Sequence, residues 1–191
     1  MPTKDNSNLL DVDWSKIPAP VDDGAARHLE GMHLPDVPLP ATDGSRVSLG
    51  KQQGRVVVFA YPRTGQPGEP ALVDDWDQIP GARGCTPQSC AFRDLHGALV
   101  AAGAACVFGL STQGTDYQRE AAERLHLPFA ILSDADLALT RAATLPTFVV
   151  AGQTLLKRFA MIIVDGKIAK VFYPVFPPDR NASDVLEWLR G

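Results

Sequence analysis

The sequence lacks the features that mark several large classes of protein. No apolar run approaches the length of a membrane span, and the polar start, Met-Pro-Thr-Lys-Asp-Asn-Ser-Asn, has no apolar segment typical of a secretory signal. A basic stripe is also missing, and the overall balance is mildly acidic, with 22 acidic side chains against 18 lysines and arginines. We therefore expect neither a membrane nor a nucleic acid as a partner.

Cysteine is scarce as well. The chain has three cysteines, an odd number that does not fit the disulfide framework of a small secreted protein. This favours a reducing compartment, and we predict that the protein is cytoplasmic. Cys106 lies inside an apolar run, where we expect it to pack in the core. The other two, Cys85 and Cys90, lie close together in the sequence and require a separate explanation.

The rest of the composition is that of an ordinary globular protein, with 45% hydrophobic and 21% charged residues. A chain of 191 residues is long enough for one domain with a full core. Residues 1–30 are polar and interrupted by prolines, so we expect an N-terminal extension with Trp14 and Ile17 as candidate anchors. The domain itself is predicted to span residues 31–191.

Hydrophobic patterns predict an alternation of strands and helices. Apolar runs rich in β-branched residues predict buried strands at 55–61, 105–110 and 130–132. Hairpins are predicted at 34–49, 147–156 and 159–173, the last around Asp165-Gly166. Helices are predicted at 86–103, 117–125, 134–143 and 183–189, with Ser133 and Asn181-Ala182-Ser183 as caps of the last two. This order indicates an α/β fold, a mixed central sheet flanked by helices on both faces, with an N-terminal hairpin.

The stretch 81–94 carries the chemistry. Thr86 and Pro87 are typical of a helix start, a hydroxyl that can cap followed by a proline at the first helical position. Cys85 is therefore expected at the mouth of a helix. Unpaired amide N–H groups and the positive end of the helix dipole favour the thiolate there, and the thiolate is the reactive form of cysteine.

Cys90 follows five residues later. If both cysteines were helical, their Cα atoms would stand about 8 to 9 Å apart, beyond the limit of about 7 Å for a disulfide. A disulfide thus requires the first helical turn to open, and a helix end opens most easily. We interpret the two as a redox pair, separate when reduced and linked when oxidised. The long loop 63–84 leads directly into this helix and is expected to border the site.

Two simpler explanations of the pair remain. A small buried cysteine on a helix often serves only packing. A metal site is the second explanation, but its cysteines usually have two to four residues between them, and no second Cys/His pair lies near. A copper-handling domain would also need a methionine or histidine aimed at the sulfurs, and His96 is the only one nearby.

Four motifs bear on a known family. They are an opening hairpin at 39–44, the strand before the site at 57–62, the paired cysteines at 84–94, and an arginine strand with its hairpin at 158–168. Together they resemble the peroxiredoxins of the AhpC/TSA superfamily and are similar to the peroxiredoxin Q, or bacterioferritin comigratory protein, subgroup. The resemblance runs over residues 39–189 and implies a thioredoxin-like fold, which agrees with the order of elements above.

The resemblance also implies roles for single residues. Cys85 matches the peroxidatic cysteine, and Cys90 matches the resolving cysteine. Arg158 matches the arginine that holds the thiolate and the peroxide, and Pro62 matches the proline that shields the site. The predicted catalytic residues are thus Cys85, Cys90 and Arg158, and Pro62 belongs to the predicted substrate site. No metal and no other cofactor is expected.

One departure from the family pattern affects the predicted substrate site. The family places a proline, three residues, a threonine or serine and two residues before the peroxidatic cysteine. Here Ala82 stands where the hydroxyl belongs, and a long insertion separates it from Pro62. We expect Thr64 to supply the missing hydroxyl, with Thr86 as the alternative. Pro80 is the alternative to Pro62 as the shielding proline.

The implied function is a thiol peroxidase of the atypical two-cysteine class, acting on hydrogen peroxide and organic hydroperoxides. Cys85 becomes a sulfenic acid, Cys90 converts it to a disulfide, and a thioredoxin-like protein reduces the disulfide. The protein is expected to be a monomer or a homodimer. The alternative is a thiol–disulfide exchange or redox-sensing protein, against which the cysteine spacing argues because such exchangers mostly have two intervening residues.

Overall fold

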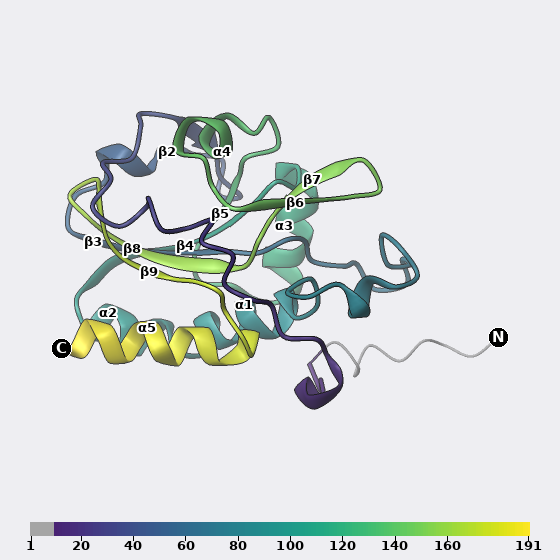
Figure 1. Cartoon of the computed structure of the whole chain (residues 1–191). Coiled ribbons are helices and arrows are strands. Elements are labelled where there is room, and N and C mark those ends of the chain that lie inside the picture. The colour runs from purple at the N-terminus through teal and green to yellow at the C-terminus, as the bar shows by residue number, and fades with distance from the viewer. Residues whose placement is uncertain (1–9) are drawn as a thin grey trace.

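A five-stranded sheet lies at the centre of the computed structural model, which describes residues 10–191 (Figure 1). In spatial order its strands are β5 (Ile131–Ser133), β4 (Ala104–Ser111), β3 (Arg55–Ala60), β8 (Phe159–Val164) and β9 (Lys167–Phe172). The first three strands run parallel, whereas β8 and β9 are antiparallel to their neighbours. The predicted mixed sheet, with β3 as its central strand, is therefore confirmed.

The sequence of β3 explains its central position. Residues 56–60 are all fully buried rather than alternately buried and exposed, because layers cover both faces of the sheet. Val57 and Phe59 face one core cluster, and Val56 and Val58 face the other. β8 is apolar in the same continuous way, with Phe159 to Ile163 fully buried.

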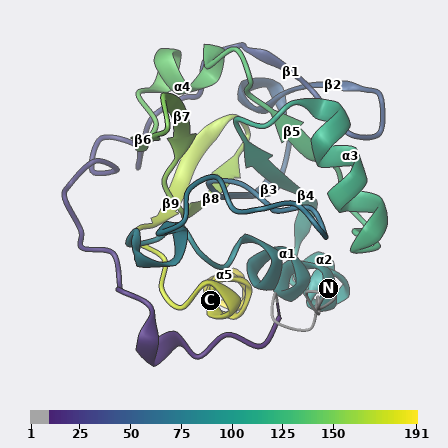
Figure 2. The ribbon, with the colours of Figure 1, turned by 90° about the vertical axis from the view of Figure 1, so that its right-hand side faces the viewer.

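Helices and hairpins cover the two faces (Figures 1 and 2). One face packs against α1 (Cys85–Asp94), α2 (His96–Ala101) and α5 (Asn181–Arg190). The other packs against α4 (Ala138–Ala143) and the hairpin of β1 (Pro38–Pro40) and β2 (Arg46–Ser48). α3 (Thr115–Arg124) lies beside β5, and β6 (Thr147–Val150) and β7 (Gln153–Leu156) form a separate hairpin. All three predicted hairpins are present.

The segment around residues 30–42 covers both edges of the sheet. At β5, the Ile131 amide donates to the Thr42 hydroxyl (3.0 Å), and the Thr42 amide donates to the Ile131 carbonyl (3.0 Å). At β9, the Ile168 amide donates to the Met32 carbonyl (2.8 Å), and the Val171 amide donates to a Glu30 carboxylate oxygen (2.9 Å). Both outer strands therefore have hydrogen-bond partners on their open sides.

The cysteine helix begins earlier than predicted. The prediction that Thr86 caps it is wrong, because α1 already includes Cys85 and its N-cap is Gly84, which has no capping side chain and a φ of 109°. Pro87 is the third helical residue rather than the first. The structure tolerates it there because the amides of the first turn have no partner within the helix in any case. A break at Leu95 divides the predicted helix into α1 and α2.

Two further predictions are corrected, and a third is refined. Ser133 does not cap α4, because its hydroxyl donates to the Gln113 carbonyl, and Asp134 caps the helix by accepting from its amides. Asn181 is the buried first residue of α5 rather than part of a cap before it. Cys106 packs against the core cluster as predicted, but it is only partly buried because it lies near the start of β4, next to the exposed Ala105.

The first nine residues of the predicted N-terminal extension lie outside the described residues. From residue 10 onward, the extension runs around one side of the molecule (Figure 2). Its candidate anchor Trp14 contacts the C-terminal segment, and Ala26 and Leu29 enter the core. Across residues 10–191, no helix combines the length and the apolar character needed to cross a membrane.

Candidate active site

Cys85 is the first residue of α1 and is only 3% exposed. The loop of residues 81–84 leads into it, and Gly84 provides the left-handed backbone turn just before the helix. At this position the amides of Cys85 and Thr86 have no partner within the helix, as expected for the first turn. Sγ lies 3.7 Å from the Ala82 carbonyl oxygen, to which the thiol form can donate a weak hydrogen bond.

Arg158 meets this sulfur because of the register of the sheet. β8 runs antiparallel to β3, and Phe159 pairs with Ala60 at the carboxyl end of β3. Arg158 precedes Phe159 and so lies just beyond that end, where the cysteine helix begins. Its Nη2 donates to Cys85 Sγ at 3.3 Å. The pairing of two strands thus joins two residues that lie far apart in the sequence.

The guanidinium of Arg158 is 2% exposed and has no carboxylate among its partners in the described chain. Nη2 also faces three consecutive carbonyl oxygens, those of Gly81 (3.2 Å), Ala82 (3.1 Å) and Arg83 (3.1 Å). Nη2 has two hydrogens, so these acceptors and the sulfur share them. Among these partners in the described chain, Cys85 is the only ionisable group.

Two further buried side chains hold Arg158 in place. Gln88, one helical turn after Cys85, accepts from Arg158 Nη1 through Oε1. Its Nε2 donates to Asn181 Oδ1 of α5 at 2.9 Å. Gln88 and Asn181 are 0% and 1% exposed, so the hydrogen bonds are shielded from water. The sequence predictions gave Gln88 no role and placed Asn181 in a helix cap. The sequence offered one indication for Gln88: it follows Cys85 by three residues, which places both side chains on the same face of a helix.

A cavity of about 150 Å³ opens onto Cys85. Its walls come from the start of α1 and from the loop 63–84, which contributes apolar side chains such as Leu72 and Trp76 as well as the charged Arg63 and Asp77. The loop is held in place by a small apolar cluster of Trp76, Ala82 and Leu155. As predicted from its position in the sequence, this loop borders the candidate site.

The structure separates the two candidate hydroxyls. Thr64 is buried, but its hydroxyl donates to Gln113 Oε1 (3.3 Å), and the residue does not line the cavity at Cys85. Thr86 does line that cavity, next to the sulfur in the sequence. Pro62 and Pro80 also lie outside the cavity lining, whereas Pro87 belongs to it. The geometry therefore favours Thr86 over Thr64 as the hydroxyl nearest to the reaction.

Cys90 lies in the same helix and is 6% exposed, but its surroundings differ. Burial raises the pKa of its thiol, while the positive charge of Arg93 partly opposes this. Both cysteines are free thiols, and both belong to α1. On helical geometry their Cα atoms stand about 8 to 9 Å apart.

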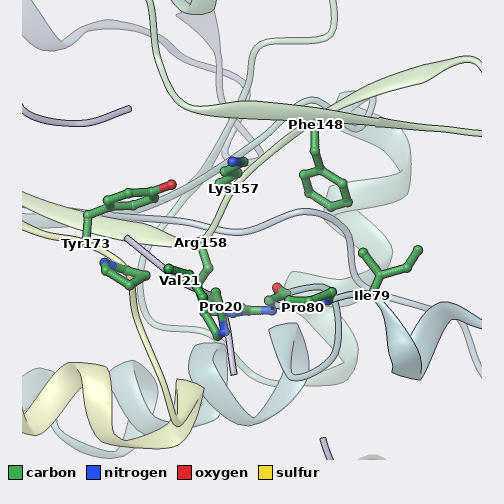
Figure 3. A pocket seen from close by; sticks show the side chains of 10 residues that line it. Pro20, Val21, Ile79, Pro80, Phe148, Lys157, Arg158 and Tyr173 are labelled. Atoms are coloured by element: carbon green, nitrogen blue, oxygen red, sulfur yellow. Dashed lines mark hydrogen bonds between the residues drawn. The ribbon is translucent and has the colours of Figure 1, made fainter. Parts of the chain in front are cut away.

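A second cavity, of about 260 Å³, lies beside Arg158 without reaching Cys85 (Figure 3). Pro20 from the N-terminal extension and Pro80 from the loop 63–84 lie next to Arg158, and Phe148 and Lys157 lie across the cavity. Two segments outside the central sheet therefore meet at the arginine that contacts the candidate nucleophile.

His96 offers no support for a copper site. Its ring packs against Phe129, with 5.9 Å between the centroids. In the part of the chain that the structure describes, no three His, Cys, Asp or Glu side chains gather as a group able to hold a metal ion.

Comparisons with known proteins agree with this geometry. Residues 29–187 match the Redoxin family. The chain is 32% identical over 161 residues to Peroxiredoxin Bcp of Escherichia coli (strain K12), covering 82% of this chain and 92% of that protein. It is 30% identical over 164 residues to Peroxiredoxin Q, chloroplastic, of Oryza sativa subsp. japonica, covering 85% of this chain and 67% of the relative.

Solved structures give the same result for the fold. Peroxidoxin BcpB from Mycobacterium tuberculosis superimposes with a TM-score of 0.66 at 27% identity, covering 84% of this chain and 96% of that one. Peroxiredoxin Q from Xanthomonas campestris superimposes with a TM-score of 0.64 at 23% identity, covering 83% and 95%. The thioredoxin-like fold predicted from the sequence is confirmed.

Proposed function

This chain belongs to the Redoxin family, within the peroxiredoxins related to peroxiredoxin Q and Bcp, so it is a thiol-dependent peroxidase, and we propose that Cys85 is its peroxidatic cysteine. The 3.3 Å contact between Cys85 Sγ and Arg158 Nη2 carries the proposal. It supplies what a thiolate nucleophile needs, a fixed positive charge in a site largely closed to water.

In the first step, the Cys85 thiolate attacks one oxygen of a hydroperoxide, and the O–O bond breaks. Sulfur gains that oxygen and is oxidised to the sulfenic acid level, while the other oxygen leaves as an alkoxide or hydroxide and takes up a proton. Negative charge therefore moves from sulfur to the departing oxygen. Arg158, whose Nη2 lies 3.3 Å from the sulfur, is the donor placed to stabilise that charge.

The proposed substrates are hydrogen peroxide and organic hydroperoxides. The apolar side chains of the cavity support the second class, because an alkyl group can lie against Leu72 and Trp76 while the peroxide faces Cys85. Thr86 is proposed to supply the hydroxyl that contacts the peroxide, because Ala82 stands where the family has a threonine or serine. Thr64 is the weaker candidate because its hydroxyl is already bonded to Gln113.

In the second step, we propose that Cys90 is the resolving cysteine. Its sulfur attacks the sulfenic sulfur, the S–O bond breaks, and the oxygen leaves as water with the proton from Cys90. Because both residues are helical, the first turn of α1 must open before their sulfurs can meet. Arg158 also donates to the carbonyls of Gly81, Ala82 and Arg83, which lie outside the helix. These acceptors remain for the buried cation when Cys85 moves away.

The pKa of Cys90 supports this order of events. Burial raises it, so the folded helix holds Cys90 as a thiol of low reactivity. Opening the first turn exposes the residue to water and removes the main cause of the shift. Cys90 thus becomes nucleophilic under the condition that also brings it to Cys85.

An external dithiol of the thioredoxin type is the proposed reductant of the disulfide. A thiol–disulfide exchange or redox-sensing role remains the second candidate, since the same cysteines would serve it. Comparing the rate of peroxide reduction with the rate of insulin disulfide reduction distinguishes the two. The cytoplasm remains our proposal for the compartment, and a monomer or homodimer our proposal for the assembly.

A peroxide titration followed by mass spectrometry tests the cysteine roles. One equivalent of hydrogen peroxide is expected to link Cys85 to Cys90 in the wild type. Cys90→Ser is expected to retain one turnover and to accumulate a sulfenic acid at Cys85 that dimedone traps. Cys85→Ser is expected to lose peroxide consumption by at least a factor of about 10³, because no other thiolate lies beside the guanidinium.

Cys106→Ser is the matched control, because Cys106 lies in β4 away from α1, and it should behave like the wild type. Wild-type turnover in Cys85→Ser would refute the proposal. A disulfide to Cys106 in place of Cys90 would refute only the assignment of the resolving cysteine.

A further inference from the structure

The N-terminal extension contains a segment, residues 13–23, that crosses the site from outside; we call it the strap. In Figure 2 it runs past α1 and α5 before it turns up toward the sheet. Asp13 starts the strap by accepting hydrogen bonds from the amide and the hydroxyl of Ser15, which fixes the single turn that holds Trp14. The strap lies outside the central sheet, so its contacts must explain its course.

Trp14 makes the first contact, at the mouth of the cysteine helix. Its indole Nε1 donates to Asp179 Oδ2 (3.1 Å), and its ring meets Phe176 edge to face at 6.1 Å. The ring also closes over Gly84, the residue before Cys85. A Cβ added to Gly84 would lie 2.8 Å from the ring and 2.6 Å from Pro178, so no space remains above the N-cap of α1.

The strap touches the site at two more points. Pro20 covers Gly81, where an added Cβ would lie 3.5 Å from the proline ring, and Figure 3 shows Pro20 and Pro80 next to Arg158. Asp23 pairs with Lys157, the residue before Arg158, and accepts from the Tyr173 hydroxyl at 2.6 Å. These two partners hold the pKa of Asp23 well below its usual range, so the anchor stays charged at any pH of interest.

These contacts lie on the sequence neighbours of the residues that do the chemistry. Trp14 and Pro20 cover the two ends of the loop 81–84, whose carbonyls bind Arg158 and whose last residue caps the cysteine helix. Asp23 holds the residue adjacent to the arginine. The loop is therefore confined on its inner side by the guanidinium and on its outer side by the strap.

We propose that the strap controls the opening of α1, and that Trp14 is a positioning residue that holds the helix mouth closed over the reduced cysteine. The inference rests on the proposed function, because the formation of the Cys85–Cys90 disulfide requires the first turn to open. Outward movement of Gly84 would bring it against the indole and Pro178, which leave no room even for a Cβ on this residue. Opening thus requires Trp14 to leave its place between Phe176 and Asp179.

The consequence for the reaction is a slower second step. While the helix stays closed, the sulfenate of Cys85 is held next to Arg158 and away from Cys90. A second hydroperoxide can then oxidise it to a sulfinate, with one more oxygen transferred to sulfur and one more alcohol or water released. The strap thus favours the closed form that reacts with peroxide, at the expense of the open form that makes the disulfide.

Hydrogen exchange of the reduced protein tests the strap without any peroxide. In Trp14→Ala, the amides of a peptide covering residues 82–92 are expected to exchange about tenfold faster, the effect of losing one packed aromatic contact. Trp14→Phe keeps an aromatic ring against Phe176 but loses the indole donor to Asp179 and the Cη2 atom over Gly84, so it should restore only part of the protection. Lys16→Ala is the matched control, because Lys16 lies in the same turn but its side chain is 80% exposed.

Rapid-mixing kinetics provide the second measurement. After one equivalent of hydrogen peroxide, Trp14→Ala should form the disulfide about tenfold faster than the wild type, and more peroxide should be needed to convert half of Cys85 to the sulfinic acid. Lys16→Ala should match the wild type in both readings. A purely structural role for Trp14 would speed exchange throughout the chain and leave the disulfide rate unchanged.

Two results overturn the proposal: unchanged exchange and disulfide rates in Trp14→Ala, or faster exchange spread evenly over the core strands. Failure of the proposed function looks different, because the wild type itself would then form no Cys85–Cys90 disulfide. The exchange experiment decides the role of the strap in that case too, since it uses only the reduced protein.

Discussion

Cys85 and Cys90 lie in one helix, and both are almost fully buried, yet their surroundings are opposite in character. Cys85 Sγ lies 3.3 Å from a buried guanidinium and lines a cavity. Cys90 has no such partner, and burial raises the pKa of its thiol. The two exposed fractions, 3% and 6%, would not distinguish them. The polar groups that replace water, rather than the degree of burial, therefore separate the two thiols.

The difference follows from the position of each residue along α1. The first turn has unpaired amides and faces the end of β3, where the sheet register places Arg158. One and a half turns later, the amides are bonded within the helix and no strand end is near. A single short helix thus places one cysteine beside a buried guanidinium and the other where burial raises the pKa of its thiol.

Removing the positive charge of Arg158 beside Cys85 should have the largest effect on the difference between the two cysteines. Arg158→Met keeps most of the side-chain volume but leaves the sulfur without its cation. We expect the rate constant for the first peroxide reaction to fall by about 10² to 10³, as when a donor to a developing anion is lost. Stopped-flow measurement of sulfenic acid formation tests this.

Arg158→Lys is the partner variant, because it keeps the charge but has only one donor group for the carbonyls and the sulfur. It should retain more activity than Arg158→Met. Equal loss in both variants would show that the shape of the guanidinium, and not its charge, matters. Unchanged reactivity in Arg158→Met would remove the basis for distinguishing the two cysteines.

The pH dependence of disulfide formation tests the same difference at Cys90. Because burial raises the pKa of its thiol, the proton stays on Cys90 at neutral pH. Opening of the helix removes that shift, but the ordinary pKa of a cysteine thiol, about 8.5, still lies above pH 8. The thiolate fraction therefore grows up to tenfold per pH unit, and the rate of disulfide formation should rise by up to about tenfold per unit between pH 6 and 8. Single-turnover kinetics followed by acid quench measure this slope.

Arg93→Gln extends the same test. The positive charge of Arg93 lowers the pKa of Cys90, so its removal should raise that pKa further and slow disulfide formation several-fold at pH 7. The first peroxide reaction should not change. A rate of disulfide formation that is independent of pH would contradict the assignment of Cys90 as the attacking thiol.

The last test compares the two threonines, and the smallest expected effect is that of Thr64→Val. Thr86→Val should lower the rate constant for peroxide reduction about tenfold, because it removes the hydroxyl that lines the cavity beside Cys85. Thr64→Val should change it less than about twofold, since that hydroxyl is bonded to Gln113. The reverse order of effects would restore Thr64 as the substrate contact. Thermal unfolding of both variants serves as the control for stability.

Most strands and hairpins of the fold could be predicted from the sequence because they depend on local patterns. Continuous apolar runs predicted β3, β4 and β8, and Asp165-Gly166 predicted the hairpin of β8 and β9, where both turn residues have positive φ. The cysteines drew attention to the start of a helix. The meeting of Cys85 with Arg158 was expected from the family resemblance alone, because no local pattern links the two positions.

The parts that were not predicted depend on contacts between distant segments. Gly84 carries no capping side chain, so the helix start was placed at Thr86, which has one. Gln88 and Asn181 form a hydrogen bond across two helices that the sequence does not place together. Trp14 was named as an anchor, but its partners, Phe176 and Asp179, lie at the other end of the chain. Tertiary packing decided each case.

The covered sheet edges restrict how copies of this protein can associate. A bare edge strand is a template on which a second chain can add a strand and continue the ladder. Here Thr42 occupies the outer side of β5, and Met32 and Glu30 occupy the outer side of β9. A dimer that extended the central sheet would therefore first have to displace these contacts, and crowded or heat-stressed molecules have to expose β5 or β9 before the central sheet can aggregate edge to edge.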